Sequence, residues 1–126
     1  MNMKNIFALI AIVAIPSVIF YSCKSEPVLP EEQVSFSTDI QPIIQQGCWH
    51  SGCHGDSLNG AFKLTDYDKI MDKGEVEPGK PNNSKLYEVI TLTSGEDKMP
   101  QDPYPALTDR QIKLIYIWIA QGAPNN

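Results

Sequence analysis

The chain begins with a basic residue and a continuous apolar run. Lys4 precedes an apolar stretch from Ile6 to Phe20, which is interrupted only near its end by Pro16 and Ser17. A charged start, an apolar segment and a small residue before the cleavage point are the layout of a secretory signal. The run is also shorter than the roughly 20 apolar residues that a membrane span needs. The pattern therefore predicts a signal peptide over residues 1–22, with an uncleaved membrane anchor as the alternative.

Residues 23–34 have a composition of their own. The segment from Lys24 to Gln33, KSEPVLPEEQ, is rich in proline and glutamate and poor in apolar residues. Such a segment cannot form a core, so it is expected to be a flexible tether. Residues 35–126 remain, and their length allows one small folded domain.

Apolar residues recur at helical spacing in four segments of this domain. The segments cover residues 39–46, 64–71, 84–90 and the stretch from Thr108 to just before Gly122. Thr38, Thr65 and Ser84 are the expected N-caps of the first three helices. Gly47 is the expected end of the first one.

The last of these helices has the clearest pattern. Thr108 and Gln111 form a capping box, and Gly122 is the expected terminator. The apolar face consists of Leu114, Ile115, Trp118 and Ile119. No segment alternates as a strand would. The sequence therefore predicts an all-α domain of three to four short helices joined by long loops, which bury little apolar surface on their own. A large flat apolar cofactor would supply the missing packing material.

The net charge of the chain restricts the classes of molecule that it is expected to bind. The 126 residues carry a formal net charge of −5 and the pI is about 4.8. Removal of the signal would take away Lys4 and leave the mature protein more acidic still. No basic patch interleaved with aromatic residues is present, which argues against nucleic-acid binding. An acidic protein favours partners with basic docking surfaces.

The three cysteines fall into one single residue and one pair. Cys23 follows Ser22 directly after the apolar run, which resembles a bacterial lipoprotein cleavage site, although bulky Tyr21 precedes the serine. We therefore predict that Cys23 is lipidated, with an ordinary signal peptide and an incidental cysteine as the alternative. Cys48 and Cys53 then remain as an even pair in an oxidising compartment, where free thiols do not persist without a reason.

The pair lies in the stretch CWHSGCH, from Cys48 to His54. Two thiols can add across the two vinyl groups of haem and form thioether bonds, which fixes the haem edge to one short loop. A histidine directly after the second cysteine is then held beneath the ring, where its imidazole can coordinate iron. Attachment and ligation are thus coupled by adjacency in the sequence.

This stretch resembles the haem-attachment site of c-type cytochromes. The usual spacing has two residues between the cysteines; this chain has four, and the family includes variants with longer spacing. The resemblance implies that Cys48 and Cys53 are the thioether sites of one covalent haem c and that His54 is the proximal iron ligand. The extra residues are expected to bulge outward with the help of Gly52. His50, between the attachment points, is expected to be a surface residue or a neighbour of the site.

Two other readings of the same residues stay open. Cys48 and Cys53 can pair as a disulfide, as cysteines of exported proteins often do. A disulfide leaves the adjacent histidine and the later methionine unexplained. Cys48, His50, Cys53 and His54 can also be read as zinc ligands. Zinc sites usually draw their ligands from two separated clusters, and the sequence has no second cluster.

A sixth iron ligand would have to be a methionine, because the chain has no third histidine. Met99 is the better candidate: it lies in an expected loop, and Pro100 favours an extended backbone at the residue before it. Met71 falls on an expected helix, where packing is the more usual role. An open sixth position is the remaining alternative.

The rest of the domain adds to the resemblance. The sequence from Met99 to Ala123 resembles the end of small bacterial cytochrome c domains, which share a Met-Pro loop and a final helix with an aromatic residue. Residues 78–87 resemble the middle of such domains. The resemblance covers residues 35–126 and implies a small cytochrome c-like fold in which the first and last helices meet. Trp118 is then expected near the haem or against the first helix, with a plain core position as the alternative.

The resemblance implies a one-electron carrier rather than an enzyme, since filled axial positions leave no place for a substrate on iron. Its partners would be redox proteins of a respiratory or periplasmic chain. Lipid on Cys23 would tie the domain to a membrane, so we expect an exported, periplasm-facing lipoprotein of the inner or outer membrane or the cell surface. The alternatives are a haem domain with an open iron site for sensing or peroxide chemistry, and a lipoprotein with a Cys48–Cys53 disulfide and no haem.

Overall fold

The computed structural model describes residues 32–50, 52–55 and 62–126. The expected signal peptide, Cys23 and all but the last three residues of the expected tether lie outside the described residues. Within the described part, no helix combines the length and the apolar content that crossing a membrane requires.

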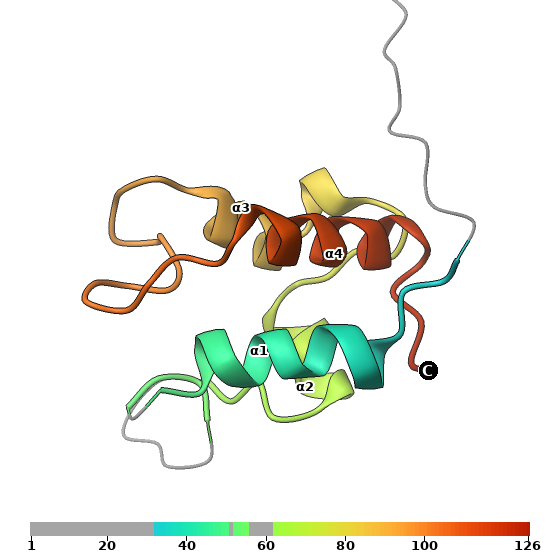
Figure 1. Cartoon of the computed structure of the whole chain (residues 1–126), viewed down its shortest axis with the longest axis horizontal. Coiled ribbons are helices and arrows are strands. Elements are labelled where there is room, and N and C mark those ends of the chain that lie inside the picture. The colour runs from blue at the N-terminus through green and yellow to red at the C-terminus, as the bar shows by residue number, and fades with distance from the viewer. Residues whose placement is uncertain (1–31, 51, 56–61) are drawn as a thin grey trace, which may run out of the picture.

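The described chain is all-α and contains no strand, as the sequence predicts (Figure 1). A π-helical turn, η1, leads directly into the first α-helix, and a 3-10 turn, η2, precedes the third. The elements are η1 (Phe36–Ile40), α1 (Gln41–Cys48), α2 (Tyr67–Lys73), η2 (Pro81–Asn83), α3 (Lys85–Thr91) and α4 (Asp109–Ala120). In the view of Figure 1, α1 and α2 lie below α3 and α4.

The two ends of the described chain meet beside α4. The backbone N–H of Ser37 donates to the carbonyl of Asn126 at 2.9 Å, and the N–H of Phe36 donates to Asn126 Oδ1 at 2.8 Å. Val34 is already buried, and its N–H donates to Gln121 Oε1 at 2.9 Å. Packing of the domain therefore begins at Val34.

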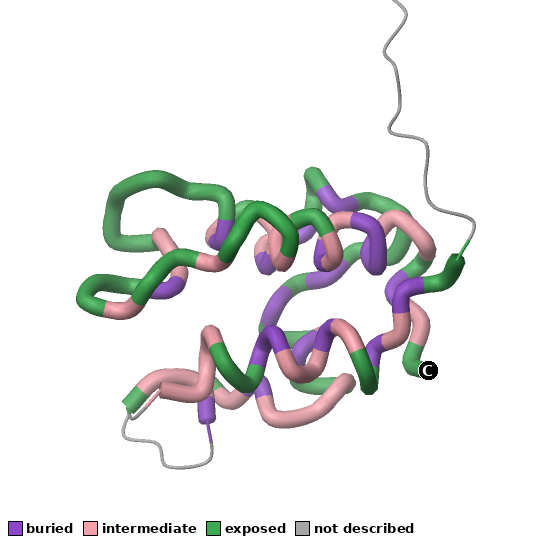
Figure 2. The backbone as a smooth tube through the Cα atoms, in the orientation of Figure 1, coloured by how far each residue is buried: buried purple, intermediate pink, exposed green. Residues whose placement is uncertain are grey.

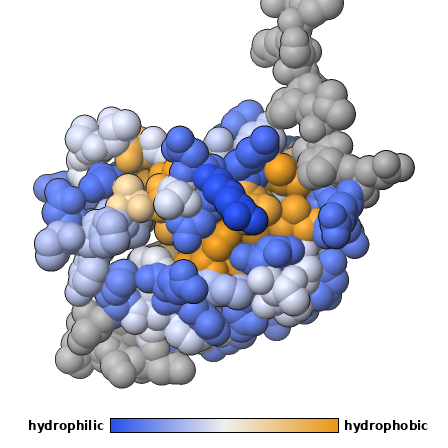
Figure 3. Space-filling view, viewed as in Figure 1, coloured by the Kyte–Doolittle hydropathy of each residue, from blue (hydrophilic) through white to orange (hydrophobic). Residues whose placement is uncertain are grey.

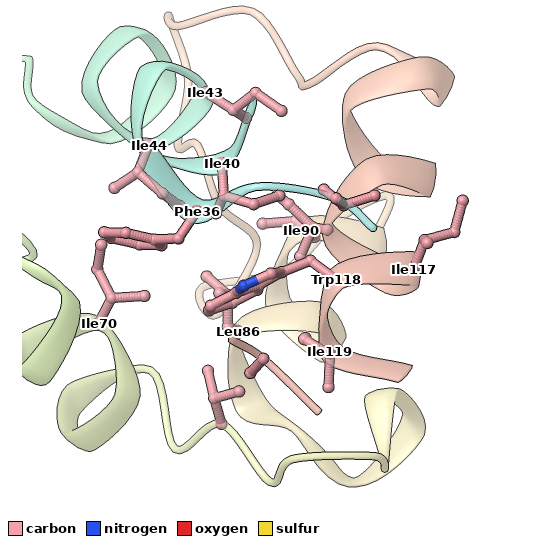
Figure 4. Close-up of a cluster of buried hydrophobic side chains, with 14 of the residues drawn as sticks. Phe36, Ile40, Ile43, Ile44, Ile70, Leu86, Ile90, Ile117, Trp118 and Ile119 are labelled. Atoms are coloured by element: carbon pink, nitrogen blue, oxygen red, sulfur yellow. The ribbon is translucent and has the colours of Figure 1, made fainter. Parts of the chain in front are cut away.

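The core joins the first helical segment to the last one. Trp118 is fully buried; its ring centroid lies 5.8 Å from that of Phe36 and 6.4 Å from that of Tyr67. Its indole N–H donates to the carbonyl of Pro124 at 2.9 Å, so its polar atom is satisfied. Around it pack isoleucines and a leucine of η1, α1, α2, α3 and α4, several of which appear in Figure 4: Ile40, Ile43, Ile44, Ile70, Leu86, Ile90, Ile115, Ile117 and Ile119.

The surface of the domain carries both hydrophobic and hydrophilic side chains. Hydrophobic side chains remain visible between hydrophilic ones across the middle of the face in Figure 3. Residues 91–97, which start at the last residue of α3, are exposed along their whole length (Figure 2). This exposed segment leads into Met99.

The caps of the first helix differ from the prediction. The N-cap of η1 is Ser35, not Thr38: Ser35 Oγ accepts from the N–H of Thr38 at 3.4 Å, and Asp39 Oδ2 accepts from the N–H of Ser35 at 2.8 Å. This reciprocal pair starts the helical segment before the predicted position. Gly47 does not end the helix, which continues to Cys48. A Cβ at Gly47 would lie 2.7 Å from Leu107 Cδ2, so this glycine permits a close approach of the chain before α4.

The caps of the middle helices are also corrected. Helix α2 starts after Asp66, not Thr65, because Asp66 Oδ1 accepts from the N–H of Lys69 at 3.0 Å. Ser84 stands at the N-cap position of α3, but its hydroxyl makes no cap bond. The buried Ser84 hydroxyl donates to the carbonyl of Lys80 and accepts from the N–H of Glu77, both at 3.0 Å. It therefore closes the turn before α3.

The pattern of α4 is confirmed. Thr108 and Gln111 make both bonds of the capping box, and Gly122 has a positive φ of 96° after the last turn. Of the predicted apolar face, Ile115, Trp118 and Ile119 are fully buried and Leu114 is half-buried, while Ile117, outside that face, is buried as well. Helix α4 is therefore the element that the sequence specifies most completely.

Candidate functional site

The cysteine loop, residues 48–54, starts at the last residue of α1 and is closed by two backbone hydrogen bonds. The N–H of His54 donates to the carbonyl of Cys48, and the N–H of Cys53 donates to the carbonyl of His50, both at 2.9 Å. Gly52 takes a positive φ of 81°, a conformation that glycine adopts without strain. The loop therefore brings both cysteines and His54 together although four residues separate the cysteines.

Two of the four residues between the cysteines have side chains that contact the rest of the domain. The indole N–H of Trp49 donates to the carbonyl of Leu64 at 2.9 Å, and the Trp49 side chain packs partly buried against the core. The ring of His50 stacks on the ring of Tyr104. Both rings therefore find a partner in the domain, and His50 is a neighbour of the site, as one of the two expectations for it states. Gly52, by contrast, is exposed.

The imidazole of His54 has a fixed orientation. Its Nδ1 lies 2.8 Å from the backbone carbonyl of Phe62. A carbonyl oxygen can only accept a hydrogen bond, so Nδ1 carries the proton and donates, and Nε2 of the neutral ring keeps its lone pair. Metal-binding histidines commonly have one nitrogen engaged in this way. The ring of Phe62 also lies against His54, with centroids 4.6 Å apart. His54 is thus arranged to offer Nε2 as a ligand.

Two cavities adjoin at His54. The first, of about 260 Å³, lies between the cysteine loop and residues 99–104. The second, of about 220 Å³, lies between His54, Phe62 and the helices α2 and α3. Cys48, His54 and Met99 border both cavities. Together the two cavities fall within the roughly 300–1,000 Å³ of typical ligand sites.

The lining of the two cavities suits an apolar group. The second cavity is bordered by Leu64, Leu86, Val89 and Ile90, besides the lysines and acidic residues at its edge. Phe62 also borders it and is 47% exposed, so a large apolar ring lies in contact with solvent there. An apolar molecule in this space would remove that surface from water, which is favourable.

The two methionines of the described chain occupy different environments. Met99 is half-buried, its N–H donates to the carbonyl of Val89 at 2.9 Å, and it borders both cavities. Met71 packs against the hydrophobic core and borders neither of these two cavities. The structure therefore brings Met99, and not Met71, together with Cys48 and His54.

The electrostatics of Cys48 favour the protonated thiol. Burial, with a smaller contribution from nearby Cys53, raises the pKa of the Cys48 thiol to about 11. The thiolate is the reactive form of a cysteine, so the Cys48 thiol is a weak nucleophile in this environment. Among the described residues, no three His, Cys, Asp or Glu side chains are grouped so that they could hold a metal ion. Cys48 and Cys53 are both free thiols in this structure.

Three other aromatic residues have defined roles in or beside the site. Trp118 borders neither cavity, so core packing against the first helical segment is the role found for it. The carbonyl of Phe62 and the ring of Tyr104 contribute to the site without having been singled out in the sequence. A backbone carbonyl has no signature in the sequence, and Tyr104 lies outside any periodic pattern.

No protein family model, no curated protein and no solved structure gives a match to this chain.

Proposed function

We propose that this chain is a mono-haem c-type cytochrome that carries single electrons. The observation that carries the proposal is the convergence of Cys48, His54 and Met99 on two adjoining cavities. Cys53 borders the first cavity beside them. These are the residues that the resemblance to the cytochrome family assigns to the haem, and they come from two distant parts of the chain.

The residues present fit a haem in this space. Cys48 and Cys53 would hold it through thioether bonds, and His54 would coordinate iron through Nε2, which the bond from Nδ1 to Phe62 leaves available. Met99 would supply a second iron ligand from the opposite loop. When bound, the haem supplies a one-electron iron couple whose potential depends on its ligands and burial.

The protein would then set the properties of that couple. A methionine thioether favours the reduced iron and raises the potential. The apolar side chains that border the second cavity, among them Leu86, Val89 and Ile90, would cover part of the haem and lower its exposure to water. With His54 and Met99 both engaged, no position is left for a substrate, so the proposed role is transfer of electrons and not catalysis.

The proposal places the domain outside the cytoplasm. Residues 1–22 would direct export, Cys23 would carry the lipid, and residues 23–34 would link the anchor to the domain. Several acyl chains bind a membrane stably, whereas one binds only weakly. The net charge of −5 favours redox partners with basic docking surfaces.

The test is a reduced-minus-oxidised absorption spectrum of protein exported with its signal intact from a host that matures c-type cytochromes. Denaturation and acid–acetone extraction then follow. Sharp bands in the reduced state, with colour that stays on the polypeptide, are expected. A double Cys48→Ala, Cys53→Ala variant is the matched control, and any haem it binds should be extracted.

Colourless protein from cells that mature a control cytochrome would refute the proposal. A lipoprotein with a Cys48–Cys53 disulfide would then be the leading account, and mass spectrometry of the unreduced protein would detect that bond.

A further inference from the structure

The cysteine loop contacts the methionine loop, residues 98–104, through two aromatic rings. The rings of His50 and Tyr104 are stacked, with centroids 3.9 Å apart and an interplanar angle of 8°. Both side chains are half-buried and both border the first cavity. Because Met99 borders the same cavity, the stacked pair joins the loop of His54 to the loop of Met99.

The methionine loop is fixed on its other side by the backbone. The N–H of Met99 donates to the carbonyl of Val89 in α3 at 2.9 Å. Within the loop, the N–H of Tyr104 donates to the carbonyl of Gln101 at 3.0 Å, which closes a turn. The backbone of Met99 is thus tied to α3, and the ring of Tyr104 is tied to the cysteine loop.

The spacing of the cysteines makes this contact available. Four residues separate Cys48 from Cys53, two more than the usual attachment site has. Trp49 is occupied by its bond to Leu64, and His50 is the residue that reaches the methionine loop. The loop therefore places one aromatic ring, that of His50, at the edge of the first cavity.

We propose that His50 is a positioning residue for Met99. Its ring, stacked on Tyr104, holds the methionine loop against the cysteine loop and keeps the Met99 side chain at the cavity. The inference rests on the proposed haem function and deepens it, since it assigns a role to the longer cysteine spacing. Without the stack, the methionine loop would leave the cavity more often, and an external ligand would compete better with Met99.

The test uses the matured haem protein and measures the affinity of the reduced form for carbon monoxide. His50→Ala and Tyr104→Ala remove the stack, whereas His50→Phe and Tyr104→Phe keep a flat ring in its place. Each alanine variant is expected to bind carbon monoxide about 2- to 10-fold more tightly, the equilibrium factor for loss of one aromatic stacking contact. The phenylalanine variants are expected to bind it as the unmodified protein does.

Two further variants separate positioning from general loosening of the fold. In the double variant His50→Ala, Tyr104→Ala, the affinity should rise no further than in either single variant, because both remove the same contact. Tyr116→Ala removes a different aromatic pair, formed by Tyr116 and Tyr87. The ring centroids of this pair lie 5.3 Å apart, and neither residue borders either of the two cavities. It should lower the melting temperature and leave the carbon monoxide affinity unchanged.

Three results would overturn the inference. The first is a carbon monoxide affinity in His50→Ala equal to that of the unmodified protein. The second is a double variant in which the effects of the two alanine substitutions multiply as if independent. The third is an increase in carbon monoxide affinity in Tyr116→Ala as large as that in His50→Ala. Failure of the haem proposal is seen at an earlier stage, because the unmodified protein would then show no covalent haem in its spectrum. In that case the inference about His50 is refuted together with the proposal on which it rests.

Discussion

Substitution of the two methionines should separate a ligand from a packing residue. Met99 borders both cavities, whereas Met71 packs against the core formed by α2 and its neighbours. We therefore expect Met99→Ala to change the haem spectrum. We expect Met71→Ala to lower the stability and to leave the haem spectrum unchanged. The haem spectrum is thus the measurement that separates the two roles.

The magnitude for Met71 follows from its burial. Truncation of a fully buried methionine to alanine costs about 2–5 kcal/mol. Met71 is half-buried, so the expected cost lies at the low end, about 2 kcal/mol. For a domain of this size, each 1 kcal/mol lowers the melting temperature by about 4–8 °C, so the expected decrease is on the order of 10 °C. Thermal unfolding followed by circular dichroism measures it.

The magnitude for Met99 is spectroscopic. Cytochromes with a methionine on the iron show a weak long-wavelength absorption band in the oxidised state, and loss of the methionine should abolish this band. The reduction potential should fall. Carbon monoxide should then bind the reduced protein directly. Met99→Ala with an unchanged band and potential would refute the assignment. If Met71→Ala abolished the band instead, the sixth ligand would be Met71 and the cavity argument would be wrong.

Three further substitutions or conditions test the fold and the cysteines. Trp118→Ala, which empties a fully buried site, should lower the free energy of unfolding by about 3–5 kcal/mol in urea titrations; a loss below about 1 kcal/mol would contradict the described core. Thr108→Ala, which removes the capping box, should cost about 0.5–2 kcal/mol in the same assay, and Thr108→Ser should restore most of it. In haem-free protein at pH 8, iodoacetamide should label Cys53 before Cys48, because burial raises the pKa of Cys48 to about 11 and keeps its reactive thiolate scarce. The Cys48 labelling rate, followed by mass spectrometry, should then rise with pH up to about 11, and equal rates at pH 8 would show that Cys48 is accessible and unshifted.

The sequence predicts the helices best where the signals are local. In α4, the capping box of Thr108 and Gln111, the apolar face and Gly122 all agree, and the helix forms as expected. The starts of α1 and α2 were misplaced because several capping residues stand close together. Ser35 prevails over Thr38, and Asp66 over Thr65, through bonds that the sequence alone does not rank.

The residues of the candidate site also differ in how strongly the sequence marks them. The sequence predicts Cys48, Cys53 and His54 as haem-binding residues because the proposed chemistry depends on their adjacency, and the structure brings them to one cavity. Met99 was identified by its residue type and its position in a loop, and the structure brings it to the same cavities. The carbonyl of Phe62 was missed, because a backbone acceptor leaves no mark on residue identity.

A longer spacing between the cysteines would be expected to loosen the loop that carries His54, yet the structure compensates for it twice. The hydrogen bond from the N–H of His54 to the carbonyl of Cys48 closes the loop across the extra residues. The side chains of Trp49 and His50 then bind to opposite neighbours, the chain before α2 and the methionine loop. Both contacts restrict the motion of the loop. The longer spacing therefore costs little order at His54, and the ring of His50 adds a contact to the loop of Met99.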